Sequence, residues 1–134
     1  MPMTRIAKAA TSAAPVPAGV GRRYEIHELL GRGGMACVYR ATDHSLSRAV
    51  ALKQLVVDRS AAEHANAAAL FEREFHTLMQ LRHPHVIDVY DYGLCDDGNP
   101  FYTMELLDGG DLRERAPMGW REACRLAFDV CSAL

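Results

Sequence analysis

The chain has 134 residues, a length within the size of one domain. Its 15 basic and 17 acidic residues give a net charge of −2, so the charge balance predicts no binding to nucleic acid or to a membrane surface. A hydrophobic content of 49% is ordinary for a globular protein and too high for a disordered one. No apolar run approaches the roughly 20 residues that a membrane span needs, so we expect no span in this chain.

The first 23 residues are rich in alanine, proline, serine and glycine. They carry basic residues but no acidic one, and the first carboxylate of the chain is Glu25. Because they contain no apolar signal core, we expect residues 1–23 to form a flexible leader, with a targeting segment or a tail for an anionic partner as the alternative. Folded structure is expected to begin at Tyr24.

A glycine-rich turn follows the first predicted strand, which covers residues 24–30. The turn occupies residues 31–36, and residues 38–43 read as a second strand, so the two strands should form an antiparallel pair. Backbone N–H groups in such a turn are open to phosphate oxygens, because glycine has no Cβ to block the approach. A third strand is predicted over residues 48–56 and contains Lys53, which can add a positive charge to the same phosphates. We therefore predict a clamp for the triphosphate of ATP.

A long helix is predicted from Ser60 to about Leu81, because Ser60 and Glu63 have the spacing of a capping box. Phe71, Glu74, Leu78 and Leu81 recur at helical spacing and share one face. Glu74 is the only charged residue on that face. We expect it to have a partner, because burying an unpaired carboxylate costs on the order of several kcal/mol. Lys53 is its natural partner, and the alternative is a solvated Glu74 at the rim of the face.

The remaining chain predicts two more strands and another helix. Residues 86–92 and 101–106 read as strands joined by turn-forming residues, and Asp111 is placed to begin a short helix. The last helix begins after Gly119 and carries an apolar stripe formed by Ala123, Ala127, Val130 and Leu134. An uncovered stripe of this kind favours self-association.

In this order the motifs resemble the first half of a protein kinase domain. Gly31, Gly33, Ala36 and Val38 resemble the GxGxxGxV loop of the family, and residues 50–53 resemble its VAIK strand. Glu74 resembles the helical glutamate that pairs with the strand lysine, and residues 101–112 resemble the strand and hinge that hold adenine. The amino-acid sequence of residues 31–41 is similar to the corresponding segment of bacterial serine/threonine kinases of the eukaryotic-like type, and the resemblance covers residues 24–134.

The resemblance implies an α+β fold with a five-stranded antiparallel sheet and one long helix. It divides the chain into a kinase small lobe with the hinge over residues 24–107 and an incomplete start of the large lobe over residues 108–134. It also implies ATP as the bound nucleotide, Mg²⁺ as the metal of the full domain, and a protein hydroxyl as the phosphate acceptor. A dehydrogenase of the dinucleotide-binding type is a distant alternative, because that fold needs its glycine turn between a strand and a helix of a parallel sheet.

Individual roles follow from the same resemblance. Lys53 would hold the α- and β-phosphates, and Glu74 would orient Lys53. The glycine loop would cover the phosphates, and it comprises Gly31, Arg32, Gly33, Gly34, Met35 and Ala36. Adenine would lie between Leu30, Val38, Ala51 and Met104, with Met104 as gatekeeper. Backbone groups of Glu105 and Leu107 would bond the adenine edge, and Asp111 would face the ribose or the substrate, unless it caps a helix.

Several residues depart from the family pattern. Ala36 stands at the third glycine position, and a side chain there resists positive φ and should stiffen the loop. His83 and His85 form a pair of potential metal ligands, but no third ligand is near in sequence, so no metal site is predicted. Cys37 reads as a small, partly buried thiol, with a redox switch as the alternative.

The other thiols are Cys95, Cys124 and Cys131, and none of the cysteines forms a CxxC pair. Cys124 and Cys131, seven residues apart on the last predicted helix, read as core residues. Scattered thiols without a signal peptide are typical of a reducing compartment, which predicts a cytoplasmic location.

The His-Arg-Asp and Asp-Phe-Gly motifs of the family do not occur in the 134 residues. Those motifs supply the residue that accepts the hydroxyl proton and the ligands of Mg²⁺. We therefore expect the ATP-binding portion of a serine/threonine kinase, truncated before the catalytic loop and inactive alone. The alternative is a non-catalytic module that binds nucleotide or pairs with another kinase.

Overall fold

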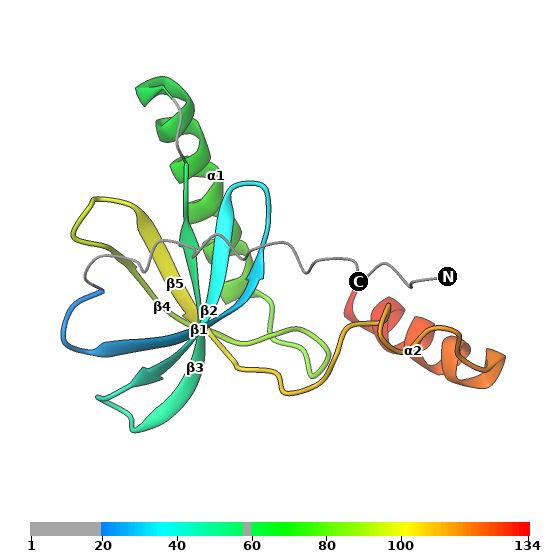
Figure 1. Cartoon of the computed structure of the whole chain (residues 1–134). Coiled ribbons are helices and arrows are strands. Elements are labelled where there is room, and N and C mark those ends of the chain that lie inside the picture. The colour runs from blue at the N-terminus through cyan, green and yellow to red at the C-terminus, as the bar shows by residue number, and fades with distance from the viewer. Residues whose placement is uncertain (1–19, 58–59) are drawn as a thin grey trace, which may run out of the picture.

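Figure 1 shows the computed structural model of the chain, whose described residues are 20–57 and 60–134. Five strands form one antiparallel sheet in the order β1-β2-β3-β5-β4. They are β1 (Tyr24–Arg32), β2 (Ala36–Asp43), β3 (Arg48–Leu55), β4 (Val89–Leu94) and β5 (Pro100–Met104). Helix α1 (Ala61–Gln80) packs on the sheet, and α2 (Trp120–Ala133) lies apart from it, as Figure 1 shows. The α+β class, the antiparallel sheet and the long helix are confirmed. All strand pairs of this sheet are antiparallel, unlike the parallel pairs of a dinucleotide-binding fold.

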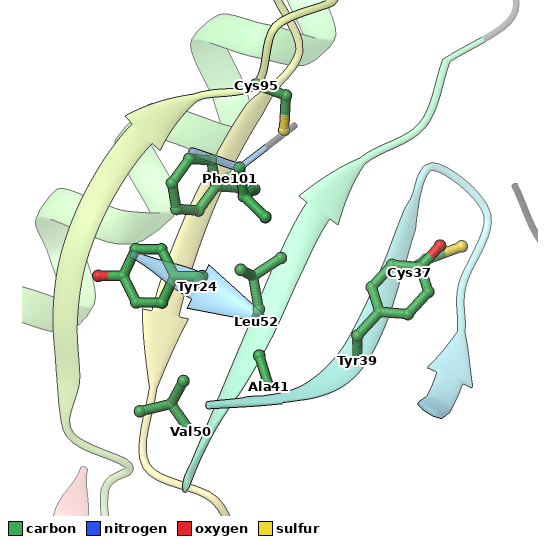
Figure 2. Packing of buried hydrophobic residues seen from close by; sticks show 9 residues of the cluster. Tyr24, Cys37, Tyr39, Ala41, Val50, Leu52, Cys95 and Phe101 are labelled. Atoms are coloured by element: carbon green, nitrogen blue, oxygen red, sulfur yellow. The ribbon is translucent and has the colours of Figure 1, made fainter. Parts of the chain in front are cut away.

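One face of the sheet is closed by the curl of the sheet itself. Alternate residues of β2, among them Cys37, Tyr39 and Ala41, point into this face because side chains alternate along a strand. Figure 2 shows them packed with residues of the other strands, and the rings of Tyr24 and Phe101 meet edge to face with centroids 5.7 Å apart. Strand β1 thereby folds over the middle of the sheet.

Arg23 joins the two edge strands of the sheet. Its guanidinium donates to both carboxylate oxygens of Asp43 at the end of β2, at 3.0 and 2.8 Å, and to Asp91 of β4 at 2.8 Å. The Tyr24 hydroxyl donates to the same oxygen of Asp91, at 3.2 Å. Asp43 is only 1% exposed, and the hydrogen bonds from Arg23 lower its pKa against the opposing effect of burial. These bonds hold the sheet in its curled shape.

The other face of the sheet is covered by α1. The helix begins with the expected capping box, in which the Ser60 Oγ accepts from the Glu63 N–H and the Glu63 carboxylate accepts from the Ser60 N–H. Its buried residues are Ala67, Phe71 and Phe75, one turn apart from each other. Of the stripe expected from the sequence, Phe71 and Leu78 pack in this core, whereas Leu81, the C-cap, is 45% exposed, and the buried Phe75 was not expected.

All five strands differ from the expected ones by one to three residues at one end or both, and β4 and β5 differ at both ends. Strand β4 begins at Val89 rather than at residue 86, because the chain first turns, with the Val86 N–H donating to the His83 carbonyl at 3.1 Å. Strand β5 ends at Met104 rather than at residue 106. The segment after Asp111 forms turns and not the expected short helix.

Both ends of the described chain differ from expectation. Val20 is 8% exposed and belongs to the core of the curled face, so packed structure includes residues assigned to the leader; residues 1–19 lie outside the described part. Cys124 and Cys131 on α2 are exposed, so the prediction that they are core residues was wrong. The reason is that α2 has no buried residue in this structure. The Oδ1 atom of Asp129 on α2 lies 3.5 Å from the Nε2 atom of His85 in the loop before β4.

The Arg23 bonds predict a pH-dependent contribution to stability. In Arg23→Gln the Asp43 carboxylate stays buried without its cation, so we expect a lower melting temperature at pH 7 than in the unchanged protein. Because Arg23 lowers the pKa of folded Asp43, its contribution is complete above the ordinary aspartate pKa of about 3.9 and is lost as the pH falls through the lower folded value. The difference between the two proteins should therefore shrink below about pH 4. Arg22→Gln, at the exposed neighbouring position, is the control, and a pH-independent difference would contradict this account.

Candidate nucleotide-binding site

The glycine-rich turn connects β1 and β2 as a hairpin, with Gly31 opposite Val38 and Arg32 opposite Cys37. The Gly33 N–H donates to the Ala36 carbonyl at 2.8 Å, so this amide is used within the hairpin. Ala36 belongs to β2 and pairs with Leu55, and it does not have a positive φ. The expected stiffening by alanine at the third glycine position therefore finds no conformational basis in this structure.

Open space surrounds the glycines of the hairpin. A Cβ added to Gly31 or Gly34 would meet no atom within 4 Å, and neither residue has a positive φ. Neither crowding nor backbone conformation in the protein therefore requires glycine at these two positions. Because these residues have no side chain, their backbone is accessible from outside, which suits a bulky anionic ligand.

Lys53 lies on β3 between Val38 of β2 and Tyr102 of β5. Its Nζ donates to the Glu74 Oε1 of α1 at 2.6 Å, so the predicted pairing is confirmed. The Lys53 side chain is 22% exposed and that of Glu74 45%, so the carboxylate is both paired and at the rim. Partial burial acts to raise the pKa of Glu74, but hydrogen bonds from Lys53 and Tyr102 outweigh it and lower that pKa. The Glu74 carboxylate is therefore ionised at neutral pH.

Tyr102 is a member of this group that the sequence did not identify. Its hydroxyl donates to the same Glu74 Oε1 at 2.7 Å, and the residue is only 1% exposed. Its position opposite Lys53 in the β3–β5 ladder places both side chains on the face covered by α1. Knowledge of that register would have been needed to find it.

A cavity of about 460 Å³ lies between the glycine hairpin and α1. Lys53 and Glu74 line it together with the whole hairpin from Gly31 to Ala36, Val38 and apolar residues of the sheet and helix. A second cavity of about 470 Å³, at the other end of α1 and beside β4, contains neither Lys53 nor Glu74. The first cavity is therefore the place where cationic, amide and carboxylate groups converge.

The residues assigned to adenine lie beside this cavity and do not line it, apart from Val38. Ala51 and Met104 are direct cross-strand partners, and Ala51 shares the face of Lys53 two residues away. Ala51 is 5% exposed, whereas Leu30 of β1 is 47% exposed. Ala51 and Met104 are therefore the two members of this set that lie side by side, and the sandwich around adenine stays a prediction.

The hinge residues are placed by local hydrogen bonds. The Glu105 N–H donates to the Asp88 carbonyl at 2.8 Å, which fixes the chain after β5, while Leu107 is 62% exposed. The Asp111 Oδ1 accepts from the N–H groups of Arg113 and Glu114, at 2.7 and 3.2 Å. Asp111 thus caps a turn, which is close to the capping alternative, and nothing here joins it to the other predicted site residues.

The remaining candidates do not form a site. The His83 Nδ1 accepts from the His85 N–H at 3.1 Å, and among residues 20–57 and 60–134 no cluster of three His, Cys, Asp or Glu is suited to a metal ion. Cys37 is 2% exposed, so it is more deeply buried than the partly buried thiol that the sequence predicted. In the same described ranges no helix is long and apolar enough to cross a membrane.

A glycine hairpin beside a strand lysine, with the lysine paired to a glutamate of the packed helix, places the sheet and α1 in the class of α+β small lobes. Comparison with known families narrows this class. The protein kinase domain family matches residues 24–133, and the chain belongs to that family.

Similar proteins are bacterial serine/threonine-protein kinases. The chain is 43% identical over 101 residues to a probable kinase of Streptomyces coelicolor, SCO3848, covering 73% of this chain and 15% of that protein. It is 37% identical over 125 residues to PknB of Mycolicibacterium smegmatis, covering 88% of this chain and 20% of that protein. A solved structure, the apo form of PpkA-294, matches with a TM-score of 0.63 and 25% identity over 74% of this chain and 41% of that one. The chain thus spans a fifth or less of the length of these two sequence relatives.

The open surroundings of Gly34 predict a separation of stability from binding. Gly34→Val should leave the melting temperature nearly unchanged, because the added side chain meets no protein atom within 4 Å at its Cβ. The same side chain blocks the approach of phosphate, so we expect nucleotide affinity to fall about tenfold or more, a loss typical of one well-placed contact. Calorimetric titration with ATP and a thermal melt measure the two effects.

Gly98, at the turn between β4 and β5, is the matched control. Its φ is +82°, so Gly98→Val strains the backbone and should lower the melting temperature. Its nucleotide affinity should be that of the unchanged protein. Equal losses of affinity in both variants would contradict a ligand-related role for the hairpin glycines.

Proposed function

We propose that residues 24–107 are the ATP-binding small lobe of a bacterial serine/threonine protein kinase, and that residues 108–134 begin its large lobe. The observation that carries the proposal is the 2.6 Å ion pair between Lys53 and Glu74 at the cavity beneath the glycine hairpin. The resemblance to bacterial serine/threonine-protein kinases supports the choice of ATP and of a protein hydroxyl as acceptor.

In this proposal each part of the site has one task. The Lys53 ammonium neutralises phosphate charge, and Glu74 keeps it aimed into the cavity. Backbone N–H groups of the hairpin donate to phosphate oxygens, while the face formed by Ala51 and Met104 receives the adenine ring. Glu105 and Leu107 would bond the adenine edge, and Asp111 would face the ribose or the substrate.

Transfer of the γ-phosphate needs groups that these 134 residues do not supply. Magnesium is the metal of the kinase family, and it neutralises phosphate charge when bound. The part of the chain that the structure describes holds no cluster of three metal-ligating side chains, so it does not fit that ion by itself. We therefore propose that this chain binds ATP without catalysing transfer alone, and that it acts in the cytoplasm, where ATP is available and its four free thiols stay reduced.

ATP binding is tested with Lys53→Ala. The unchanged protein should show a rise in melting temperature with Mg-ATP, since a ligand that binds the folded state stabilises it. Lys53→Ala should lose this rise while keeping its fold, as judged by circular dichroism. Arg82→Ala removes an exposed cation outside the cavity and should retain the rise. A rise of equal size in Lys53→Ala would show that ATP binds elsewhere or through other groups.

We also propose that α2 mediates self-association. Its apolar residues Trp120, Val130 and Leu134 are 72%, 55% and 100% exposed, and together with Ala123 and Ala127 they form one side of the helix. Uncovered apolar surface of this kind drives association in water.

Ala127→Glu places a charge in the middle of that side of α2. We expect the unchanged chain to sediment as oligomers and Ala127→Glu to shift toward the monomer. Ser132→Glu adds the same charge away from that side and should sediment like the unchanged chain. A monomer at all concentrations for the unchanged chain would reject the proposal.

A further inference from the structure

Two donors from different strands meet at one carboxylate oxygen of α1. The Glu74 Oε1 accepts from the Lys53 Nζ of β3 at 2.6 Å and from the Tyr102 hydroxyl of β5 at 2.7 Å. The Lys53 Nζ is also 5.6 Å from the centroid of the Tyr102 ring. The three side chains therefore form one connected group across two strands and a helix.

The Tyr102 ring is held on several sides. It contacts the rings of Phe71 and Phe75, with centroid separations of 5.1 and 5.6 Å, and the residue is 1% exposed. A buried tyrosine ring has few rotamers available, so its hydroxyl occupies a defined position. The donor that reaches Glu74 from β5 is thus a rigid one.

The carboxylate that accepts this bond is much less restrained by itself. The Glu74 side chain is 45% exposed, and an ion pair between flexible, solvated side chains contributes little to holding a geometry. Hydrogen bonds to a charged acceptor are stronger than those between neutral groups, and a rigid donor adds direction. The Tyr102 hydroxyl therefore supplies the restraint that the Lys53–Glu74 pair lacks.

We infer that Tyr102 is a positioning residue for the nucleotide site, whose hydroxyl holds the Glu74 carboxylate in the arrangement that aims Lys53 at the phosphates. The inference rests on the proposed function, in which Lys53 binds ATP. The ring of Tyr102 builds the core under α1, and the hydroxyl is the part that acts on the site.

The charge states agree with this arrangement. Burial and the neighbouring Glu74 raise the pKa of Tyr102, so its hydroxyl remains a donor throughout the neutral range. Lys53 of β3 and Tyr102 of β5 face the Glu74 carboxylate, and Arg32 of the glycine hairpin lines the same cavity. Tyr92 of β4 packs on Phe75 nearby, and Arg73 lines a shallow cavity beside Glu74 on its own helix.

Tyr102→Phe tests the inference, because it keeps the ring and removes only the donor. Loss of a hydrogen bond to the charged form raises the pKa of Glu74, so protonation should uncouple Lys53 at a higher pH. We expect the affinity for Mg-ATP at pH 7 to fall about threefold to tenfold, and the acid limb of the affinity profile to move to higher pH. Titration of ATP itself is the same for both proteins and cancels in the comparison.

Tyr92→Phe is the matched control, since Tyr92 also packs on Phe75 but lies on β4. Its affinity and pH profile should equal those of the unchanged protein. Tyr102→Met is a second variant without the hydroxyl, chosen because methionine adapts to the space of the ring. It should show the same shift of the acid limb.

The outcomes separate this inference from the proposed function. If Tyr102→Phe melts at a lower temperature but keeps the affinity and pH profile of the unchanged protein, the hydroxyl is only structural and the inference is wrong. Failure of both Tyr102 variants to fold would also overturn the inference, because the residue would then be required for the fold itself. If Lys53→Ala binds Mg-ATP normally, the proposed function itself fails, whatever the Tyr102 variants do.

Discussion

The ion pair between Lys53 and Glu74 is the contact on which the geometry of the site depends, because it joins the sheet to α1 at the edge of the cavity. Its atoms are 2.6 Å apart, yet one partner is nearly half exposed. A pair so accessible to water and salt contributes little stability by itself. What keeps α1 at the right distance is the apolar contact beneath the pair, where Phe71 and Phe75 pack on the ring of Tyr102.

The sheet has a separate hydrophobic core on each of its two faces. The core on the curled face includes Val20, Tyr24 and Phe101 and contains no residue of the candidate site. The core on the α1 face includes Phe71, Phe75 and Tyr102 and lies directly under the Lys53–Glu74 pair. Because alternate residues of each strand face opposite sides, one strand such as β3 contributes to both. Packing on the curled face fixes the shape of the sheet, and packing on the α1 face places Glu74 of the helix beside Lys53 of the sheet.

Local sequence patterns predicted the parts of the site that depend on neighbours along the chain. The glycine turn between two strands and the capping box at Ser60 are both present. The Lys53–Glu74 pair is present too, but helical periodicity left it open, and the resemblance to protein kinases implied it. The patterns failed where the answer depends on contacts between distant elements. Tyr102 was missed because its role follows from the β3–β5 register, and Phe75 because helical periodicity allows two adjacent stripes. Cys124 and Cys131 were wrongly expected in a core, because helical periodicity shows which residues share one side of α2 and does not show whether another element covers that side.

The glycines of the chain separate what the fold requires from what a ligand requires. Gly98 has a φ of +82° and Gly93 lies so close to the Phe101 ring that a Cβ would approach it to 2.9 Å, so the fold explains both. Gly31 and Gly34 have neither constraint, although glycine loses more conformational entropy on folding than any other residue. The fold alone would be better served by larger residues there. The proposed ATP site supplies a reason for these glycines, because a bare backbone beside the Lys53 ammonium group lets phosphate oxygens approach both.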